Sequence, residues 1–322
     1  MSDQLTAILP NDSHGATAIN KSKLRLLIKA MRPYQWSKNL FVFTPLLFAK
    51  KVMEPEALGY SLTAFAVFCF LASGLYIFND WLDIEEDRAH PEKRNRPLSS
   101  GLLPVSVALA ASAILVLGAL VLASLISFQF LSIAIVYFGL TLVYCITLKR
   151  FIILDCISIA SGFVLRVVGG AVAISVVATH WLIACAFLLA LFLAFSKRRQ
   201  ELLMLSNDAA GHRTVLGEYS VAFLEKANII VIGAAIVSYA LYTVAPETTE
   251  KFQTNALIYG TVFVIYGLLR YLALIDKSEN GGDPSKMLFR DRPLLITIAA
   301  WAAYNAVVVY HTALFGNRTL PF

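Results

Sequence analysis

Long apolar stretches alternate with short polar loops along most of the chain. Each stretch is near the roughly 20 residues that an α-helix needs to cross a bilayer. The pattern predicts an all-α membrane protein with nine transmembrane helices, the first interrupted by Pro45 and closed by Lys50 and Lys51. The predicted spans are residues 36–52, 56–79, 103–124, 127–147, 152–176, 180–197, 221–244, 254–275 and 293–316.

The composition supports this class. Of the 322 residues, 58% are hydrophobic and only 15% are charged, with a mean hydropathy of +0.69. Soluble domains carry about a quarter charged residues. The four cysteines lie in apolar segments without a CxxC pair, which predicts core residues and not a disulfide frame or zinc site. We expect residues 1–30 to form a flexible cytoplasmic tail and residues 31–322 a single polytopic transmembrane domain.

The placement of the basic residues predicts the orientation. If nine spans alternate, the loops on one side hold six, four, two, four and four Lys and Arg residues, twenty in all, against four on the other side. Because basic residues concentrate on the cytoplasmic side, this predicts a cytoplasmic N-terminus in the plasma membrane, with the chemistry facing the cytoplasm. The net charge of +6 therefore indicates topology and no nucleic-acid partner.

An acidic loop follows the second predicted span. At 100° per residue, Asn79, Asp83 and Asp87 lie at about 0°, 40° and 80° around a helix, with Asp80 at about 100°. The four side chains offer oxygen ligands of the kind that Mg²⁺ prefers. The alternative is a solvated acidic helix end. Charge at the mouth of a membrane helix is costly and usually functional, which favours the metal site.

Basic and polar residues near the other helix ends match phosphate oxygens in their chemistry. For most of them the alternative is an ordinary interfacial anchor or a basic cytoplasmic flank. Arg166 lies deep in the fifth span on the same face as Asp155, so it forms either an interhelical ion pair or the floor of an anionic substrate site. The candidate phosphate-binding residues are Lys38, Lys93, Arg96, Tyr144, Lys149, Arg166, Lys197, Arg198 and Glu201.

The segment Asn79-Asp80-x-x-Asp83-x-x-x-Asp87, followed by Lys93 and Arg96-Pro97-Leu98-x-Ser100-Gly101, resembles the first aspartate motif of the UbiA-type intramembrane prenyltransferases. The resemblance implies nine transmembrane helices around a central cavity that is capped on the cytoplasmic side. It also implies that Asn79, Asp80, Asp83 and Asp87 hold Mg²⁺ on a diphosphate.

The second half departs from the usual pattern of that superfamily. Where most members carry a second aspartate-rich motif, this chain has Lys197-Arg198-Arg199-Gln200-Glu201. A cationic patch binds phosphate oxygens directly instead of through a metal. Together with Arg32-Pro33-x-Gln35-Trp36-x-Lys38-Asn39 and Asp283-Pro284…Asp291-Arg292-Pro293-Leu294, it resembles the decaprenyl-phosphate phosphoribosyltransferase branch.

Membership of that branch implies a Mg²⁺-dependent glycosyltransferase. It would join 5-phosphoribose from phosphoribosyl diphosphate (PRPP) to a polyprenyl (decaprenyl) phosphate and release pyrophosphate, on the route to arabinose donors for cell-wall polymers. Two alternatives stay open: an aromatic (quinone-precursor) prenyltransferase of the same superfamily that uses a prenyl diphosphate, and a non-enzymatic transporter or lipid-binding membrane protein. The oligomeric state stays open as well.

Overall fold

The computed structural model describes residues 23–91, 93–204, 214–277 and 291–315, and these residues form helices and loops without a β-strand. Residues 23–31 are helical. The elements that follow are η1 (Pro33–Phe43), α2 (Thr44–Phe48), α3 (Pro55–Leu82), α4 (Ile84–Ala89), η2 (Lys93–Asn95), α5 (Val105–Ile126), α6 (Phe128–Ile146), η3 (Leu148–Arg150), α7 (Leu154–Ala173), α8 (His180–Met204), η4 (Thr214–Glu218), α10 (Val221–Val244), α11 (Pro246–Phe252), η5 (Ala256–Gly260), α12 (Thr261–Lys277) and α14 (Arg292–Phe315).

Eight stretches in the described part of the chain are long and apolar enough to cross a membrane. They correspond to the second to ninth predicted spans, so the all-α, multi-pass class is confirmed. Within these stretches α3 and α7 are the most buried, at 61% of the apolar window each, and α5 and the α12 region the least, at 17% each. The burial places α3 and α7 inside the bundle and leaves broad apolar faces on the outer helices for lipid.

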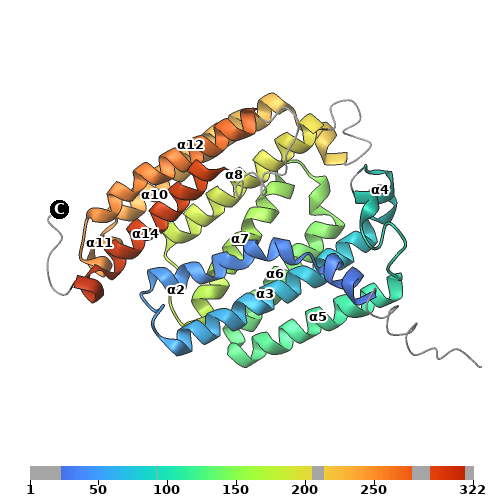
Figure 1. The fold of residues 1–322 in the computed structure, drawn as a ribbon, viewed down its shortest axis with the longest axis horizontal. Coiled ribbons are helices and arrows are strands. Elements are labelled where there is room, and N and C mark those ends of the chain that lie inside the picture. Colours follow the sequence, from blue (N-terminus) through green and yellow to red (C-terminus); the bar gives the residue numbers. More distant parts are fainter. Residues whose placement is uncertain (1–22, 92, 205–213, 278–290, 316–322) are drawn as a thin grey trace, which may run out of the picture.

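The first predicted span folds differently from a single long helix. Residues 33–43 form the 3₁₀-helix η1, and α2 continues it with Pro45 in its first turn. Figure 1 shows this pair running alongside α3 in the opposite direction, and η1 also packs against α7. Contact with α7 is very close, because a Cβ on Gly170 would lie 2.0 Å from the backbone oxygen of Val42. The absence of a side chain at Gly170 therefore allows η1 to pack against α7 inside the bundle.

Polar side chains fasten η1 to α3. Trp36 Nε1 donates to Ser73 Oγ at 3.0 Å, and Asn39 Nδ2 lies 3.1 Å from Cys69 Sγ. On the other side of α3, Ser112 of α5 donates to the carbonyl of Gly74 at 2.7 Å, where a Cβ would collide with Val116. Helix α3 is thus packed on both sides, which fixes the direction of its C-terminal end.

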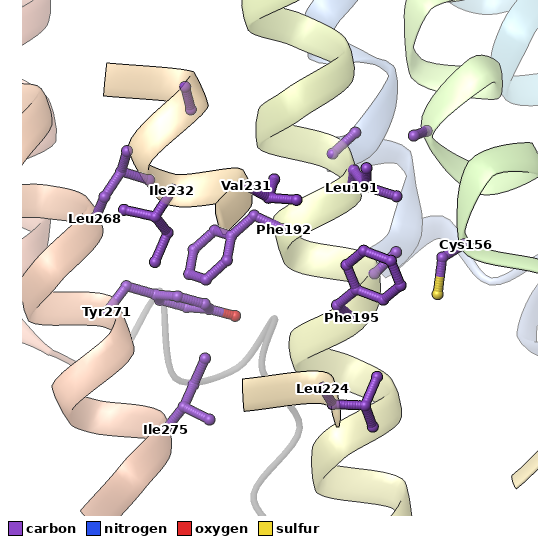
Figure 2. Packing of buried hydrophobic residues seen from close by; sticks show 14 of the residues in the cluster. Cys156, Leu191, Phe192, Phe195, Leu224, Val231, Ile232, Leu268, Tyr271 and Ile275 are labelled. Atoms are coloured by element: carbon purple, nitrogen blue, oxygen red, sulfur yellow. The ribbon is translucent and has the colours of Figure 1, made fainter. Parts of the chain in front are cut away.

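The second half of the chain packs around α8, which lies between α7 and α10. In Figure 2 the ring of Phe192 on α8 faces Tyr271 on α12, with ring centroids 5.5 Å apart at 76°. Phe195, one turn along α8, is on the side of Cys156 from α7 in the same view. This apolar cluster holds the C-terminal end of α8 close to the start of α7.

The residues before η1 also belong to the bundle. Within the predicted tail of residues 1–30, residues 1–22 lie outside the described part. Ala30, at 1% exposure, is buried with Ile77 and Leu98, and Leu26 and Leu27 pack on the same cluster. The helix at 23–31 therefore covers the end of α3 that carries the acidic loop.

Candidate active site

The acidic loop begins in the last turn of α3 and continues into α4, with Asp83 at the junction of the two helices. Asn79 and Asp83 are four residues apart and so lie on one helix face. Asn79 Nδ2 donates to Asp83 Oδ2 at 2.8 Å. The other carboxylate oxygen of Asp83 forms an ion pair with Lys149 of η3. Two residues predicted for different roles, a metal ligand and a phosphate contact, are thus direct neighbours.

Asp80 and Asp87 share one arginine. Arg96 Nη1 lies 3.0 Å from Asp80 Oδ1 and 2.5 Å from Asp87 Oδ2. Arg32, at the start of η1, forms a second ion pair with Asp80. Both carboxylates are buried, at 1% and 2% exposure. The basic half of the loop therefore compensates the negative charge of two buried carboxylates in its acidic half.

Burial has electrostatic consequences at this loop. It raises the pKa of Asp87, although Arg96 and Lys93 partly oppose the shift by favouring the carboxylate. Burial alone would lower the pKa of Arg32, but the charge of Asp80 and the hydrogen bond to it, together with Tyr34 and Tyr76, outweigh burial and leave that pKa above its usual value. Arg32 is therefore a fixed cation, and the ionisation of Asp87 depends on its basic neighbours.

The donor chemistry of this loop fits Mg²⁺, since it supplies carboxylate and carboxamide oxygens. Asp80 Oδ2 is a buried carboxylate oxygen that finds no hydrogen-bond partner in the part of the chain that the structure describes. In the described residues, however, no three His, Cys, Asp or Glu side chains gather into a group that could hold a metal ion. The carboxylates are already paired with Arg32, Arg96 and Lys149. A metal would bind only if some of these ion pairs opened.

The basic patch lies at the end of α8. Arg198 is 1% exposed, and its Nε lies 3.1 Å from Oδ2 of Asp155, which is 0% exposed. These two atoms are close enough for an ion pair but are not aligned for a hydrogen bond. Arg198 also pairs with Glu201, and Lys197 Nζ lies 3.9 Å from Glu201, four residues along α8. The adjacent Arg199 turns away and pairs with other helices.

The two patches meet at the short connection between α6 and α7. Lys149 in this connection contacts Asp83, and Asp155, six residues later, contacts Arg198. Tyr144, near the end of α6, also contributes to the electrostatic environment of Arg198. In Figure 1 the acidic α4 and the C-terminal end of α8 lie toward the same end of the bundle. The acidic loop, Lys149 and the basic patch thus lie toward one end of the bundle.

Arg166 lies inside the bundle, as predicted, and among the described residues it does not form the ion pair that was one of its two predicted roles. Its side chain is buried, with 6% of Arg166 exposed. The three guanidinium nitrogens donate to Asn39 Oδ1 at 2.6 Å, to the Gly162 carbonyl at 2.8 Å and to the Tyr137 hydroxyl at 2.8 Å. Every one of these partners is neutral. Lys38, on η1, donates to Gln35 of its own helix at 2.9 Å.

Several residues of the site were not among the predicted site residues. Arg32 belongs to the motif Arg32-Pro33-x-Gln35-Trp36 that carries the branch resemblance, but it has no predicted role, and nothing in the sequence marks Tyr219. The hydroxyl of Tyr219 donates to Asp155. Of the late motif, Asp283 and Pro284 lie outside the described residues. Asp291 accepts a hydrogen bond from the backbone N–H of Leu294 at 2.8 Å and pairs with Arg270 at 2.8 Å. Its side chain therefore caps the first turn of α14 and links it to α12.

Comparison with known proteins gives this arrangement a family. The model of the UbiA prenyltransferase family matches residues 40–292. The chain belongs to the UbiA prenyltransferase family. The structure of a UbiA homolog from Archaeoglobus fulgidus bound to GPP and Mg²⁺ has a TM-score of 0.69 at 18% identity, covering 88% of this chain and 99% of that one. At that identity the likeness establishes the UbiA fold.

Two relatives are similar to this chain along most of their length. The decaprenyl-phosphate phosphoribosyltransferase of Mycolicibacterium smegmatis is 31% identical over 294 residues, which cover 88% of this chain and 92% of the relative. The protein of the same name from Corynebacterium glutamicum is 31% identical over 322 residues, covering 95% and 96%. With eight apolar helices among its described residues, this UbiA-family chain is a multi-pass membrane protein.

Proposed function

We propose that this chain transfers 5-phosphoribose from phosphoribosyl diphosphate (PRPP) to a polyprenyl phosphate such as decaprenyl phosphate, and releases pyrophosphate. The observation that carries the proposal is the similarity to two decaprenyl-phosphate phosphoribosyltransferases over 88% and 95% of this chain. The basic end of α8 supports it, because a substrate with a phosphate at one end and a diphosphate at the other needs cationic contacts at both ends.

The acidic loop is the proposed site of the diphosphate. Asn79, Asp80, Asp83 and Asp87 would hold Mg²⁺, and the free buried oxygen of Asp80 supports this assignment. Bound Mg²⁺ would neutralise the negative charge of the departing pyrophosphate. Arg32, Arg96 and Lys149 now compensate the carboxylates, so they are placed to turn toward phosphate oxygens when the substrate arrives.

The transfer itself needs little proton chemistry. An oxygen of the lipid phosphate attacks the anomeric carbon of the ribose, the bond from that carbon to the diphosphate oxygen breaks, and its electron pair leaves with pyrophosphate. A phosphate monoester is already an anion near neutral pH, so no strong general base is required. Positioning of the two substrates and stabilisation of charge supply most of the rate.

The remaining candidates are proposed to contact phosphate groups. Arg166 suits this role because it is buried and hydrogen-bonded only to neutral groups among the described residues. Arg198 holds its position between Asp155 and Glu201. The full set is Lys38, Lys93, Arg96, Tyr144, Lys149, Arg166, Lys197, Arg198 and Glu201. The polyprenyl tail would lie between apolar helices that open toward lipid.

The proposed topology has nine crossings, with the N-terminus and the active site at the cytoplasmic face of the plasma membrane. The eleven residues of η1 and the five of α2 supply the ninth. At about 2.0 Å per residue in a 3₁₀-helix and 1.5 Å in an α-helix, the pair reaches about 30 Å, the thickness of the hydrocarbon core. The lipid product of the proposed reaction would enter the synthesis of arabinose donors for cell-wall polymers.

The test compares two donors with one purified enzyme. Pyrophosphate release is measured with phosphoribosyl diphosphate plus polyprenyl phosphate, and separately with a prenyl diphosphate plus an aromatic acceptor. We expect release only with the first pair, and only when the lipid phosphate is present. Release only with the second pair would replace this proposal by an aromatic prenyltransferase, and release with neither would favour a transporter or lipid-binding protein.

A further inference from the structure

The hydroxyl of Tyr219 joins three parts of the site. Tyr219 lies between η4 and α10, and its side chain is buried at 5% exposure. The hydroxyl accepts a hydrogen bond from the backbone N–H of Ile153 at 2.7 Å and donates one to Asp155 Oδ1 at 2.6 Å. Burial, reinforced by the bond to Asp155, raises the pKa of Tyr219, so the hydroxyl keeps its proton and remains a donor.

The backbone at Ile153, whose N–H donates to this hydroxyl, is strained. Ile153 has φ 67° and ψ −46°, and the N–H of Leu154 bonds back to the carbonyl of Ile152 at 2.7 Å. This is a γ-turn with positive φ, a rare conformation and an unfavourable one for a β-branched residue. Such strain persists only where surrounding contacts impose it. The bond from Ile153 to Tyr219 is a contact of that kind.

The strained turn sits between two functional side chains. Four residues before Ile153, Lys149 pairs with Asp83 of the acidic loop, and two residues after it, Asp155 lies 3.1 Å from Arg198. The helical turns η3 and η4 also pack against each other, so the segment of Tyr219 lies beside the segment of Lys149. A change in the turn would move both ion pairs together.

We propose that Tyr219 is a positioning residue for the proposed phosphoribosyl transfer. Its hydroxyl holds the η3–α7 turn so that Lys149 at the acidic loop and Arg198 at the basic patch face the same donor molecule. It acts on Arg198 through Asp155, whose second oxygen is the one that faces the guanidinium. This inference rests on the proposed function, because it assigns the two patches to one substrate.

The test removes the hydroxyl and keeps the ring. In Tyr219→Phe we expect kcat to fall by about 10- to 100-fold, the range for a group that orients a direct contact. The dissociation constant for phosphoribosyl diphosphate should rise, while the KM for polyprenyl phosphate should stay within threefold. The matched control is Tyr304→Phe, which removes a 2.6 Å hydrogen bond to the carbonyl of Ala256 away from both patches. It should lower the midpoint of thermal unfolding similarly and leave donor binding unchanged.

Two further variants separate positioning from folding. If Tyr219 acts through Asp155, adding Tyr219→Phe to Asp155→Asn should cost less than threefold more in kcat, since the two changes break one chain of contacts. Ile153→Gly relieves the positive φ and should restore the stability of Tyr219→Phe without restoring donor binding. Equal donor binding in Tyr219→Phe and Tyr304→Phe, or full additivity with Asp155→Asn, would overturn the inference. A wild-type enzyme that releases no pyrophosphate would instead overturn the proposed function.

Discussion

Arg96 Nη1 lies 2.5 Å from Asp87 Oδ2, nine residues earlier in the chain. The contact folds the basic half of the loop after α3 onto its acidic half. It shows that the carboxylates proposed to hold Mg²⁺ are compensated by the protein's own cations before any substrate binds. In the proposed function, binding of the donor would therefore be an exchange of ion pairs, in which arginine and lysine side chains leave carboxylates for phosphate oxygens.

Replacing a proposed metal ligand should abolish activity without unfolding the protein. Asp83→Asn keeps the size of the side chain but removes its charge and its ion pair with Lys149. We expect kcat to fall by at least about 100-fold, the upper end of what even indirect metal contacts cost. The control is Glu86→Gln, an exposed carboxylate on the same loop, which should keep full activity. Pyrophosphate release is the measurement, and full turnover in Asp83→Asn would remove its proposed role.

Removing divalent cations should stop the reaction reversibly. With excess chelator we expect no pyrophosphate release, and addition of Mg²⁺ should restore it, because the departing group needs charge neutralisation. Without substrate the chelator should leave thermal unfolding nearly unchanged, since Arg32, Arg96 and Lys149 already compensate the carboxylates. Undiminished turnover in chelator would show that these three side chains neutralise the charge of the departing pyrophosphate without a metal.

Arg198 should matter for both stability and activity. Arg198→Met leaves Asp155 buried without its cation, which costs about 3–5 kcal/mol in the free energy of unfolding. Adding Asp155→Asn should recover most of that stability, since the uncompensated charge is gone, but should not recover turnover. Thermal unfolding and pyrophosphate release, measured on the same samples, separate the two effects.

The neighbouring arginine provides the control for that pair. Arg199 bonds Glu225 and Asp276, whose side chains are 46% and 55% exposed. Arg199→Met leaves carboxylates that water can solvate, so its cost in stability should be well below that of Arg198→Met. Equal losses for the two variants would contradict the buried position assigned to Arg198.

The placement of η1 inside the bundle can be tested with glycines. Gly170→Ala would put a Cβ 2.0 Å from the Val42 carbonyl oxygen and force backbone to move, at a cost of about 1–3 kcal/mol or more. Gly118→Ala on α5 meets nothing within 4 Å and should be neutral or slightly stabilising. The midpoint of thermal unfolding in detergent measures both, and a neutral Gly170→Ala would mean that η1 lies elsewhere.

Hydropathy predicted eight of the spans well because a membrane helix can be recognised from the length and apolar content of its sequence. The predicted span 221–244 has the same bounds as α10, and the predicted span 56–79 begins one residue after α3 begins and ends three residues before it ends. The first span could not be predicted in detail. Its 3₁₀ geometry depends on side chains such as Asn39 meeting Cys69 and Arg166 across the bundle, and no local pattern encodes those contacts.

The site was predictable to the extent that its residues form local patterns. The acidic loop follows from helical spacing, and the basic end of α8 follows from its composition. The pairings did not follow, because Lys149–Asp83 and Tyr219–Asp155 join residues 66 and 64 positions apart. Arg166 illustrates the same point: its burial was predictable from hydropathy, but its neutral partners were visible only in three dimensions.

The central claim is that one enzyme moves a phosphoribosyl group onto a lipid phosphate, and the lipid product tests it most directly. Purified protein is incubated with Mg²⁺, polyprenyl phosphate and phosphoribosyl diphosphate labelled in its 5-phosphate, and the lipid is extracted. The account predicts label in the lipid phase with wild-type protein and none with Asp83→Asn. Label that stays in the aqueous phase while a prenyl diphosphate is consumed in a parallel reaction would contradict it.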